Sequence, residues 1–353
     1  ERNLVINVEY LLTRGPRIFI ERIDIEGNTT TLDQVVRRQF DSVEGNPFNP
    51  REIREAAERI RALGFFEDAQ VNAREGSNAD QVIVDVDVEE APTGSIQFGG
   101  SFSTNDGFGI AIQFQERNFL GRGQSLGLTF STTKDDRFVR FNFGEPAFLG
   151  RDVLFDLNLD VSEQSSFNTT FQVSRGFFSP SLTFPVGTNS DLTIGSSFDS
   201  AKMKESGDDD DRGPIISREI EQGRRSAISF GYDYTYDSRS TGLDPSSGFL
   251  FSFGQDFAGI GGDDSFIRTK ASLIGQRSIF NEDIILRGAL EGGMFSLRSG
   301  ENRAVHRFFL NSNIIRGFEP GGIGPRDLTN SDDDPLGGNY YVAARFDAEF
   351  PLG

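Results

Sequence analysis

The sequence lacks several residue types that many protein chemistries require. It has no cysteine and no tryptophan, and His306 is its single histidine. The missing thiol excludes disulfides and thiolate catalysis, and one imidazole excludes a metal site built from several histidines. Carboxylate-only metal sites stay open, but no motif points to one, so we expect neither a metal nor a cofactor. With a net charge of −19, the chain also offers no basic surface for nucleic acid.

Long apolar runs are missing as well. No stretch approaches the roughly 18 apolar residues of a membrane-spanning helix, and no signal peptide is visible, which indicates a mature or excised chain. Phenylalanine and glycine are abundant, with 35 and 40 residues, while the mean hydropathy is polar. A transmembrane β-barrel explains this mixture, because only alternate residues of its strands face lipid. Composition alone also fits a large soluble β-protein.

Residues 16–91 have the pattern of a small α/β module with the order strand, helix, helix, strand, strand. We interpret residues 1–15 as the tail of a preceding module. The first strand covers Arg17–Glu26, and the phase slip between Ile20 and Ile23 predicts a bulge. The closing strands are predicted at Phe66–Arg74 and at Gln81–Glu89. A small sheet covered on one face by helices leaves an edge free for strand addition, unless other segments cap it.

The two helices of this module have different start signals. Thr31 followed by Gln34 predicts a capping box for the first helix, whose apolar side begins at Leu32. Asn49 before Pro50 predicts the start of the second helix. Gly64 is placed to end it in a left-handed conformation.

Residues 92–353 lose helical periodicity and alternate between apolar and polar residues. Val153–Val161, Ile228–Tyr236 and Tyr340–Phe350 are examples at the length that a tilted strand needs to cross a bilayer. Charged residues in the middle of the polar faces would be costly in a dry soluble core but are stable in a wet lumen. We therefore predict an incomplete antiparallel transmembrane β-barrel of about twelve strands, which start near residues 94, 107, 123, 137, 152, 167, 190, 223, 248, 264, 283 and 338.

Short and long connections alternate along this segment, as in outer-membrane barrels. The tetrapeptide Phe-Leu-Gly-Arg occurs at 119–122 and again at 148–151, which predicts two equivalent turns, and Leu243–Gly248 is a third short turn. The long connections are Lys204–Gly223 and Arg298–Gly337. Their acidic runs are typical of solvated loops, with binding of divalent ions or lipopolysaccharide as the alternative.

Several motifs resemble the BamA family of outer-membrane assembly factors with POTRA modules. Glu26-Gly27-Asn28, the Leu63–Glu67 turn and the valine-rich strand resemble the last POTRA module of that family. The long loop contains Ile315-Arg316-Gly317-Phe318, then Gly324-Pro325-Arg326 and Leu336-Gly337-Gly338-Asn339. This combination resembles the family's sixth loop with its Arg-Gly-Phe tip.

The resemblance implies that the loop folds into the lumen and that Arg316 pairs with acidic wall residues. A guanidinium suits this role because its donors form a fixed fork. Candidate partners are the inward carboxylates Asp347, Glu349, Glu291 and Asp233. Two departures stand out. Asn311-Ser312 replaces a Gly-Gly pair of the family, and the chain ends after about twelve of the sixteen strands that the resemblance implies, so the preferred partners are expected beyond Gly353.

These features predict a non-enzymatic machine in the bacterial outer membrane, with its POTRA module in the periplasm, that inserts unfolded outer-membrane proteins. The resemblance implies a periplasmic chaperone, accessory lipoproteins, the lipid bilayer and lipopolysaccharide as further partners. The first barrel strand is the candidate lateral gate, weakened by glycine at Gly94, Gly99 and Gly100 beside Ser95. Alternatively these glycines merely allow close packing. A polypeptide secretion pore of the same superfamily is the alternative function, and His306 has no nucleophile motif nearby that would favour a barrel hydrolase.

Overall fold

The chain forms two compact units. The computed structural model describes residues 17–103, 107–133, 136–165, 171–205, 213–240, 246–280, 284–310, 314–318, 321–329 and 333–350. Unit 1 comprises Glu1–Gly94 together with Arg117–Gln124, and unit 2 comprises Ser95–Glu116 and Ser125–Gly353. The predicted tail of a preceding module, residues 1–15, lies outside the described residues.

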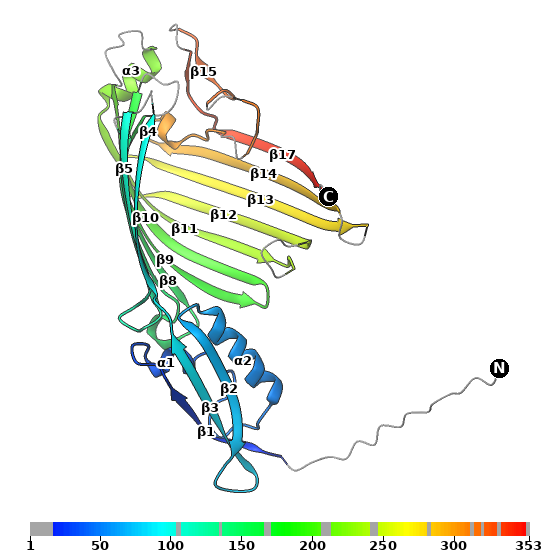
Figure 1. The fold of residues 1–353 in the computed structure, drawn as a ribbon. Helices are drawn as coiled ribbons and strands as arrows, with labels where there is room; N and C mark the ends of the chain where they lie inside the picture. Colours follow the sequence, from blue (N-terminus) through cyan, green and yellow to red (C-terminus); the bar gives the residue numbers. More distant parts are fainter. Residues whose placement is uncertain are drawn as a thin grey trace, which may run out of the picture. The chain divides into compact units, whose positions relative to one another are not determined.

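Unit 1 contains a three-stranded sheet in the order β1-β3-β2 (Figure 1). Its strands are β1 (Phe19–Glu26), β2 (Phe66–Glu75) and β3 (Gln81–Glu90). β3 lies in the centre, parallel to β1 and antiparallel to β2. The register of β1 against β3 shifts between Ile20 and Arg22. The bulge predicted from the isoleucine spacing is therefore confirmed.

Two helices cover this sheet, α1 (Asp33–Arg37) and α2 (Pro50–Ala62). Asn49 caps α2 by accepting a hydrogen bond from the Arg51 N–H at 3.1 Å, and Gly64 follows the helix with φ of +66°. Both end signals of α2 are confirmed. The core between helices and sheet is apolar and fully buried, and its members include Ile20, Val35, Val36, Ile53, Ala56, Ile60, Val84 and Val86. Because all of these contacts are local to residues 20–88, we expect the module to fold when it is produced alone.

The predicted capping box of the first helix is wrong. The N-cap position is Leu32, whose side chain is 43% exposed, and no side chain caps α1. The Thr31 hydroxyl instead accepts a hydrogen bond from the Asn118 side-chain amide at 2.8 Å. Asn118, from a distant segment of unit 1, thus forms a hydrogen bond with the hydroxyl that the local sequence predicted to cap the helix.

Glu90, the last residue of β3, organises the loop that precedes α1. Its carboxylate accepts hydrogen bonds from the Thr29 hydroxyl at 2.7 Å and from the backbone N–H groups of Thr30 and Thr31 at 2.9 and 2.6 Å. Partial burial acts to raise the pKa of Glu90, but these donors outweigh it and lower the pKa from 4.5 to about 2. The ionised carboxylate is therefore part of the folded loop.

Unit 2 is one large sheet of twelve strands that follow one another in chain order (Figure 1). Every pair from β6 to β17 is antiparallel. Each predicted strand start lies within four residues of an observed one. The strands are β4 (Gly94–Ser103), β5 (Gly107–Phe119), β6 (Gln124–Thr132), β7 (Arg137–Glu145), β8 (Leu154–Ser165), β9 (Phe171–Gly187), β10 (Ser190–Glu205), β11 (Arg224–Asp237), β12 (Ser247–Gly262), β13 (Ser265–Ile279), β14 (Ile284–Ser299) and β17 (Tyr340–Glu349).

The sheet is open. β4 and β17 are its two outer strands, and they do not pair with each other within the described part of the chain. Large apolar side chains remain exposed along the strands, for example Phe230 at 47%, Val342 at 78% and Phe346 at 72%. Such a wide apolar surface fits an apolar surrounding. None of the helices described has the length and apolar character that crossing a membrane requires.

The two Phe-Leu-Gly-Arg turns have the same backbone conformation. Leu120 and Gly121 have φ of 56° and 69°, and Leu149 and Gly150 have φ of 55° and 71°. In each turn the arginine N–H donates to the phenylalanine carbonyl at 3.2 Å. Two successive residues with positive φ are the signature of a type I′ turn. The prediction of equivalent turns is confirmed for their conformation, whereas the first half of the third turn at 243–248, residues 243–245, lies outside the described residues.

Because the pKa of Glu90 is depressed, its contribution to stability is present above the ordinary pKa of 4.5 and is lost as the pH falls toward about 2. In the isolated module, Glu90→Gln is expected to lower the free energy of unfolding at pH 7 by about 1–2 kcal/mol, since hydrogen bonds to an ionised group are strong but this one is partly solvated. Urea unfolding at pH 7, 4.5 and 2.5 measures the difference, which should shrink with falling pH. Glu89→Gln, next to it and exposed, is the control and should show no such trend. A constant deficit for Glu90→Gln across pH would contradict the assignment.

Candidate functional site

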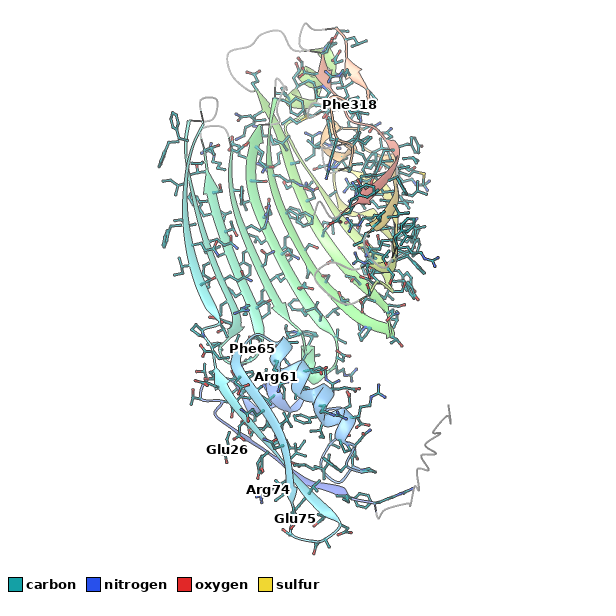
Figure 2. All side chains as sticks on the ribbon, turned by 45° about the vertical axis from the view of Figure 1, so that its right-hand side comes forward. Glu26, Arg61, Phe65, Arg74, Glu75 and Phe318 are labelled. Atoms are coloured by element: carbon teal, nitrogen blue, oxygen red, sulfur yellow. The ribbon has the colours of Figure 1, made fainter. Side chains whose placement is uncertain are left out.

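The Arg-Gly-Phe motif lies in the long connection between β14 and β17. Arg316 is exposed, Gly317 has φ of +88°, and Phe318 is 58% exposed (Figure 2). The Arg316 guanidinium makes no ion pair with any residue that the structure describes. The tip is thus a solvated, sharply turned element with an unburied aromatic ring.

The four carboxylates predicted as partners of Arg316 lie on the strands of unit 2. Asp347 on β17 pairs with Arg345 of the same strand at 3.1 Å. Glu349 is opposite Ile285, Glu291 is opposite Ala343, and Asp233 is opposite Gly254. None of the four is within ion-pair distance of Arg316 in this structure. The pairing stays a prediction.

The second half of the motif forms a small ribbon of its own. β15 (Arg326–Asp327) pairs with β16 (Asp334–Pro335) in antiparallel fashion. The Arg326 guanidinium donates to the carbonyls of Asp333 at 2.8 Å and Gly321 at 3.0 Å. The Pro325 carbonyl accepts from the Leu336 N–H at 2.9 Å. Arg326 therefore closes the ribbon on itself.

A helix that the sequence pattern did not predict packs against the base of this loop. α3 (Pro214–Glu221) lies in the connection between β10 and β11, which we had predicted to be a solvated acidic loop. Gly213-Pro214 followed by apolar Ile216 and Ile220 is a usable helix signal. Ile216 is buried with Phe171, Met203 and Leu336. α3 therefore packs between strand ends and the part of the long loop that follows the Arg316–Phe318 tip, which we call its descending side.

Asp327 fixes the descending side of the loop to the start of α3. Its carboxylate, 2% exposed at the residue level, accepts from the Ile215 N–H at 3.3 Å and from the Thr329 hydroxyl. A Cβ atom at Gly213 would lie 2.1 Å from Asp327 Oδ2. A larger residue at the position that precedes the helix would therefore displace the Asp327 carboxylate.

The ascending side of the loop, which is the part that precedes the tip, is fixed by a buried arginine. Arg303 is 1% exposed, and its guanidinium reaches the carbonyls of Ala201 and Gly223 at 3.5 and 3.4 Å. Its Nε lies 3.9 Å from Glu219 Oε2 on α3, and Glu219 accepts from the Ala304 N–H at 2.8 Å. Burial raises the pKa of Glu219, and this N–H lowers it in part.

His306 completes this anchor in η2 (Ala304–His306). Its Nε2 lies 3.3 Å from Asp264 Oδ2, and Asp264 forms a 2.6 Å ion pair with Arg225. The imidazole ring is stacked with Phe295 at 6.0 Å. Burial lowers the pKa of His306 below its ordinary value, so the ring is neutral at pH 7. The single histidine is thus a packed anchor of the loop.

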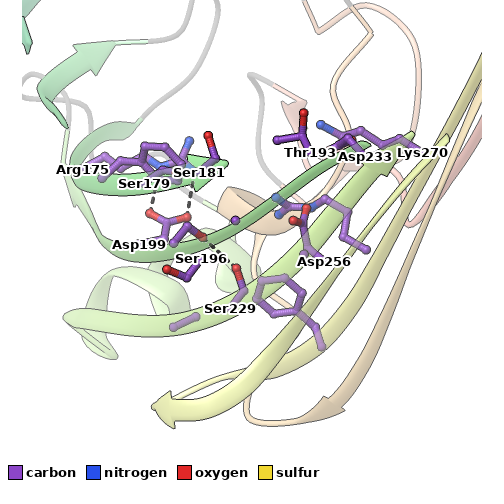
Figure 3. A pocket seen from close by; sticks show the side chains of 17 residues that line it. Arg175, Ser179, Ser181, Thr193, Ser196, Asp199, Ser229, Asp233, Asp256 and Lys270 are labelled. Carbon is purple, nitrogen blue, oxygen red and sulfur yellow. Dashed lines mark hydrogen bonds and ion pairs between the residues drawn. The ribbon is translucent and has the colours of Figure 1, made fainter. Parts of the chain in front are cut away.

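The polar face of the sheet contains a cavity of about 420 Å³ between β9 and β13 (Figure 3). Arg175 and Asp199 form a two-pronged ion pair at 2.8 and 2.7 Å on one side. On the other side Arg268 donates to the His306 carbonyl at 3.1 Å. The lining is mixed in charge and rich in hydroxyl groups, and includes Asp233, Asp256, Lys270, Thr193, Ser181 and Ser229. It suits water and polar peptide segments better than an apolar ligand.

The candidate gate strand β4 is an outer strand with exposed apolar side chains. Ile96, Phe98 and Phe102 are 60%, 77% and 79% exposed. A Cβ atom at Gly99 would first meet the Ala111 Cβ at 3.8 Å, and one at Gly100 would first meet the Gly109 carbonyl oxygen at 4.0 Å. Both are ordinary contacts. Close packing therefore does not require glycine at these two positions.

Comparisons with known proteins identify the family. The model of the Omp85 superfamily domain matches residues 118–353, and that of the surface antigen variable number repeat, POTRA, matches residues 18–91. The chain belongs to the Omp85 superfamily. The outer membrane protein assembly factor BamA of Neorickettsia risticii is 26% identical over 98% of this chain and 46% of its own length. BamA of Nitratidesulfovibrio vulgaris is 27% identical over 93% of this chain and 41% of its own.

Solved structures of the Omp85 type share the fold. BamA from Haemophilus ducreyi lacking POTRA domains 1–3 has a TM-score of 0.77 at 22% identity, covering 96% of this chain and 68% of that one. CdiB from Escherichia coli has a TM-score of 0.54 at 13% identity, covering 96% and 62%. The resemblance and the fold class predicted from the sequence are confirmed. The chain spans less than half the length of these two curated BamA relatives.

Membership of the Omp85 superfamily, with a POTRA module, makes this an outer-membrane protein. The sheet of unit 2 lies in the bacterial outer membrane and the module lies in the periplasm, as expected from the sequence. The exposed aromatic and aliphatic side chains then contact lipid, and the cavity with its charged residues belongs to the wet inner face.

Removing the buried arginine should release the long loop. In the full-length protein in proteoliposomes, Arg303→Ala is expected to destabilise the loop root by about 3 kcal/mol, the lower end for a broken buried ion pair, because the 3.9 Å separation exceeds hydrogen-bond distance. Added trypsin should then cleave after Arg316 faster than in the parent protein, as measured by mass spectrometry. Arg298→Ala, which removes an exposed arginine at the end of β14, should leave this rate unchanged. Equal cleavage of Arg303→Ala and the parent would show that the anchor is not required.

Proposed function

We propose that this chain is the membrane-inserted part, with one delivery module, of a factor that assembles outer-membrane proteins without covalent chemistry. The observation that carries the proposal is the composition of β4, an outer strand of the lipid-facing sheet among the described residues, whose Gly99 and Gly100 are not required by packing. In a bilayer each unpaired backbone group costs several kcal/mol, so a strand that is released from its neighbour calls for a new partner strand. An unfolded outer-membrane protein supplies that strand.

The composition of β4 supports exchange of partners along this edge. Gly99 and Gly100 have room for a Cβ atom, so packing does not explain them. Glycine in a strand weakens pairing through its backbone entropy and its missing side chain. A strand that pairs weakly with its neighbours can be displaced by an incoming one. The lateral gate that we place at Gly94–Ser103 rests on this argument.

The module offers an edge for delivery among its described residues. The start of β1 is covered, because Asn46 and Phe48 exchange backbone hydrogen bonds with Ile20 and Ile18 at 2.9 and 2.8 Å. β2 is the other outer strand of the three-stranded sheet, and within the described residues its outer side pairs with no strand. An extended peptide adds to such an edge by main-chain hydrogen bonds with little demand on its sequence. We infer that β2 receives unfolded substrates.

The anchored loop supports the same function. Its two sides are held in place by hydrogen bonds of Arg303 and Asp327, so the residues on both sides of the Arg316–Phe318 tip have fixed positions. The tip is free to contact either the inner wall or an arriving strand. Lipopolysaccharide at the outer surface, and a periplasmic chaperone and accessory lipoproteins at the module, are the further partners that we propose.

Site-specific photo-crosslinking in cells tests this function. In the full-length protein, a photoreactive residue at Phe98 on β4 should crosslink to a stalled outer-membrane protein substrate far more strongly than one at Phe230 on β11. Both phenylalanines are exposed on the same sheet, at 77% and 47%, which makes Phe230 a matched control. Crosslinks concentrated at the inner-wall positions Thr193 and Asp233 instead would contradict a lateral gate and indicate passage of polypeptide through the lumen.

The loop motif should matter for activity more than for folding of the module. In the full-length protein, Arg316→Ala removes the predicted pairing with wall carboxylates and is expected to reduce complementation of a depletion strain. It should also lower the barrel melting temperature, with a loss in free energy of unfolding of roughly 3 kcal/mol or less because the lumen is wet. Arg316→Lys should rescue only in part, since lysine keeps the charge but not the fork geometry. Normal growth together with unchanged melting of Arg316→Ala would show that the motif is dispensable.

A further inference from the structure

The two identical turns have different surroundings. The turn at 119–122 is part of unit 1, because the segment Arg117–Gln124 groups with the POTRA module, whereas the turn at 148–151 stays in unit 2. Their backbones are alike, with φ of 69° at Gly121 and 71° at Gly150. Differences between them therefore come from what each turn contacts and not from its own conformation.

The first turn is hydrogen-bonded to the loop that precedes α1. The Gly121 carbonyl accepts from the Leu32 N–H at 2.8 Å. Asn118, 5% exposed, donates through its amide to the Thr31 hydroxyl at 2.8 Å and accepts from the Gly123 N–H at 2.7 Å. Thr31 is itself 3% exposed. These bonds are sheltered from water and link two segments distant in sequence.

The fit between turn and loop leaves no room for a side chain. A Cβ atom at Gly121 would lie 2.0 Å from the Thr30 carbonyl oxygen. At Gly123 it would lie 2.5 Å from Arg38 Nη2 and 3.2 Å from the Val35 Cγ1. At Gly150 no heavy atom lies within 4 Å among the described residues. The close approach is specific to the first turn.

The surface that receives the turn is built in advance by the module. Glu90 binds the backbone of Thr30 and Thr31, as described above, and the Asn28 amide donates to the Thr31 carbonyl at 2.9 Å and to the Asp33 carboxylate at 2.8 Å. Gly27 lies so close to β3 that a Cβ atom would be 1.8 Å from the Val88 carbonyl oxygen. The loop is therefore tied to the central strand of the sheet.

We propose that the Phe119–Arg122 turn is a docking turn, which clips the β5–β6 hairpin to the rigid loop Gly27–Leu32 of the POTRA module. The hairpin is the immediate neighbour of β4 in the order of the sheet. A displacement of the docked loop is then passed to β5, the strand beside β4, and from β5 to the proposed gate. This part rests on the proposed function, whereas the clip itself rests on the contacts alone.

The test compares Gly121→Ala with Gly150→Ala in the full-length protein. Both place alanine at the same positive φ in the same tetrapeptide, so the local strain is matched. Hydrogen exchange followed by mass spectrometry is expected to show that Gly121→Ala speeds exchange of peptides covering 28–34 and 117–124 by about tenfold or more, as for loss of a local protected unit. Gly150→Ala should change neither peptide. Equal behaviour of the two variants would overturn the docking turn.

Thr31→Val provides a second variant that keeps shape and changes no turn residue. It removes the hydroxyl that accepts the hydrogen bond from the buried Asn118 amide, so faster exchange at 117–124 is expected with the module still folded. Unchanged exchange would count against the clip.

Substrate insertion, measured in the same proteoliposomes, tests the coupling. It should fall for Gly121→Ala and not for Gly150→Ala. If Gly121→Ala speeds hydrogen exchange but leaves insertion normal, the coupling between module and gate is contradicted, while the contact between the turn and the Gly27–Leu32 loop still stands. Crosslinking at Phe98 in the parent protein reports separately on the gate, so a failed gate and a failed docking turn give different results.

Discussion

Backbone pairing in an apolar surrounding is the constraint on which unit 2 depends. A strand in lipid must satisfy its N–H and carbonyl groups through its neighbours, because no water is available. Among the described residues each of the twelve strands pairs with its neighbours in the sheet, and only the outer sides of β4 and β17 lack a pairing strand. The alternation of side chains follows, since each paired strand presents one face to lipid and one to the wet interior. The charged cavity and the exposed phenylalanines are thus two sides of one arrangement.

A different kind of interaction fixes the long loop between β14 and β17. There the anchors are buried polar groups: Arg303 against Glu219, and Asp264 with Arg225 and His306. Buried charges of this kind add little net stability compared with apolar packing, but they tolerate few alternative arrangements. Their value is in fixing one position for both sides of a long connection. An exposed tip on a fixed base suits the proposed role of this loop in contacting changing partners.

Sequence predicted the parts of the structure that local patterns decide. The bulge near Ile20, the cap at Asn49 and the twelve strand starts all depend on residues a few positions apart. The capping box at Thr31 failed because Asn118 takes the hydroxyl, and α3 was missed because its acidic flanks hid a short apolar pattern. The anchors at Arg303 and Asp327 join segments about a hundred residues apart, which no local pattern reveals. The repeated tetrapeptide correctly indicated one conformation but not the two environments. The predicted partners of Arg316 are not brought to it here.

The close approach of Gly213 and Asp327 has a consequence for how this protein changes over evolutionary time. The two positions share one small volume, since a Cβ at the first would overlap the carboxylate of the second. Substitution of the glycine therefore requires that the Asp327 side chain moves away or has been shortened or lost. The two long connections can diverge in length and composition elsewhere, yet at this point they must drift together. Natural variants should reveal this as a linked pair of positions embedded in otherwise freely varying loops.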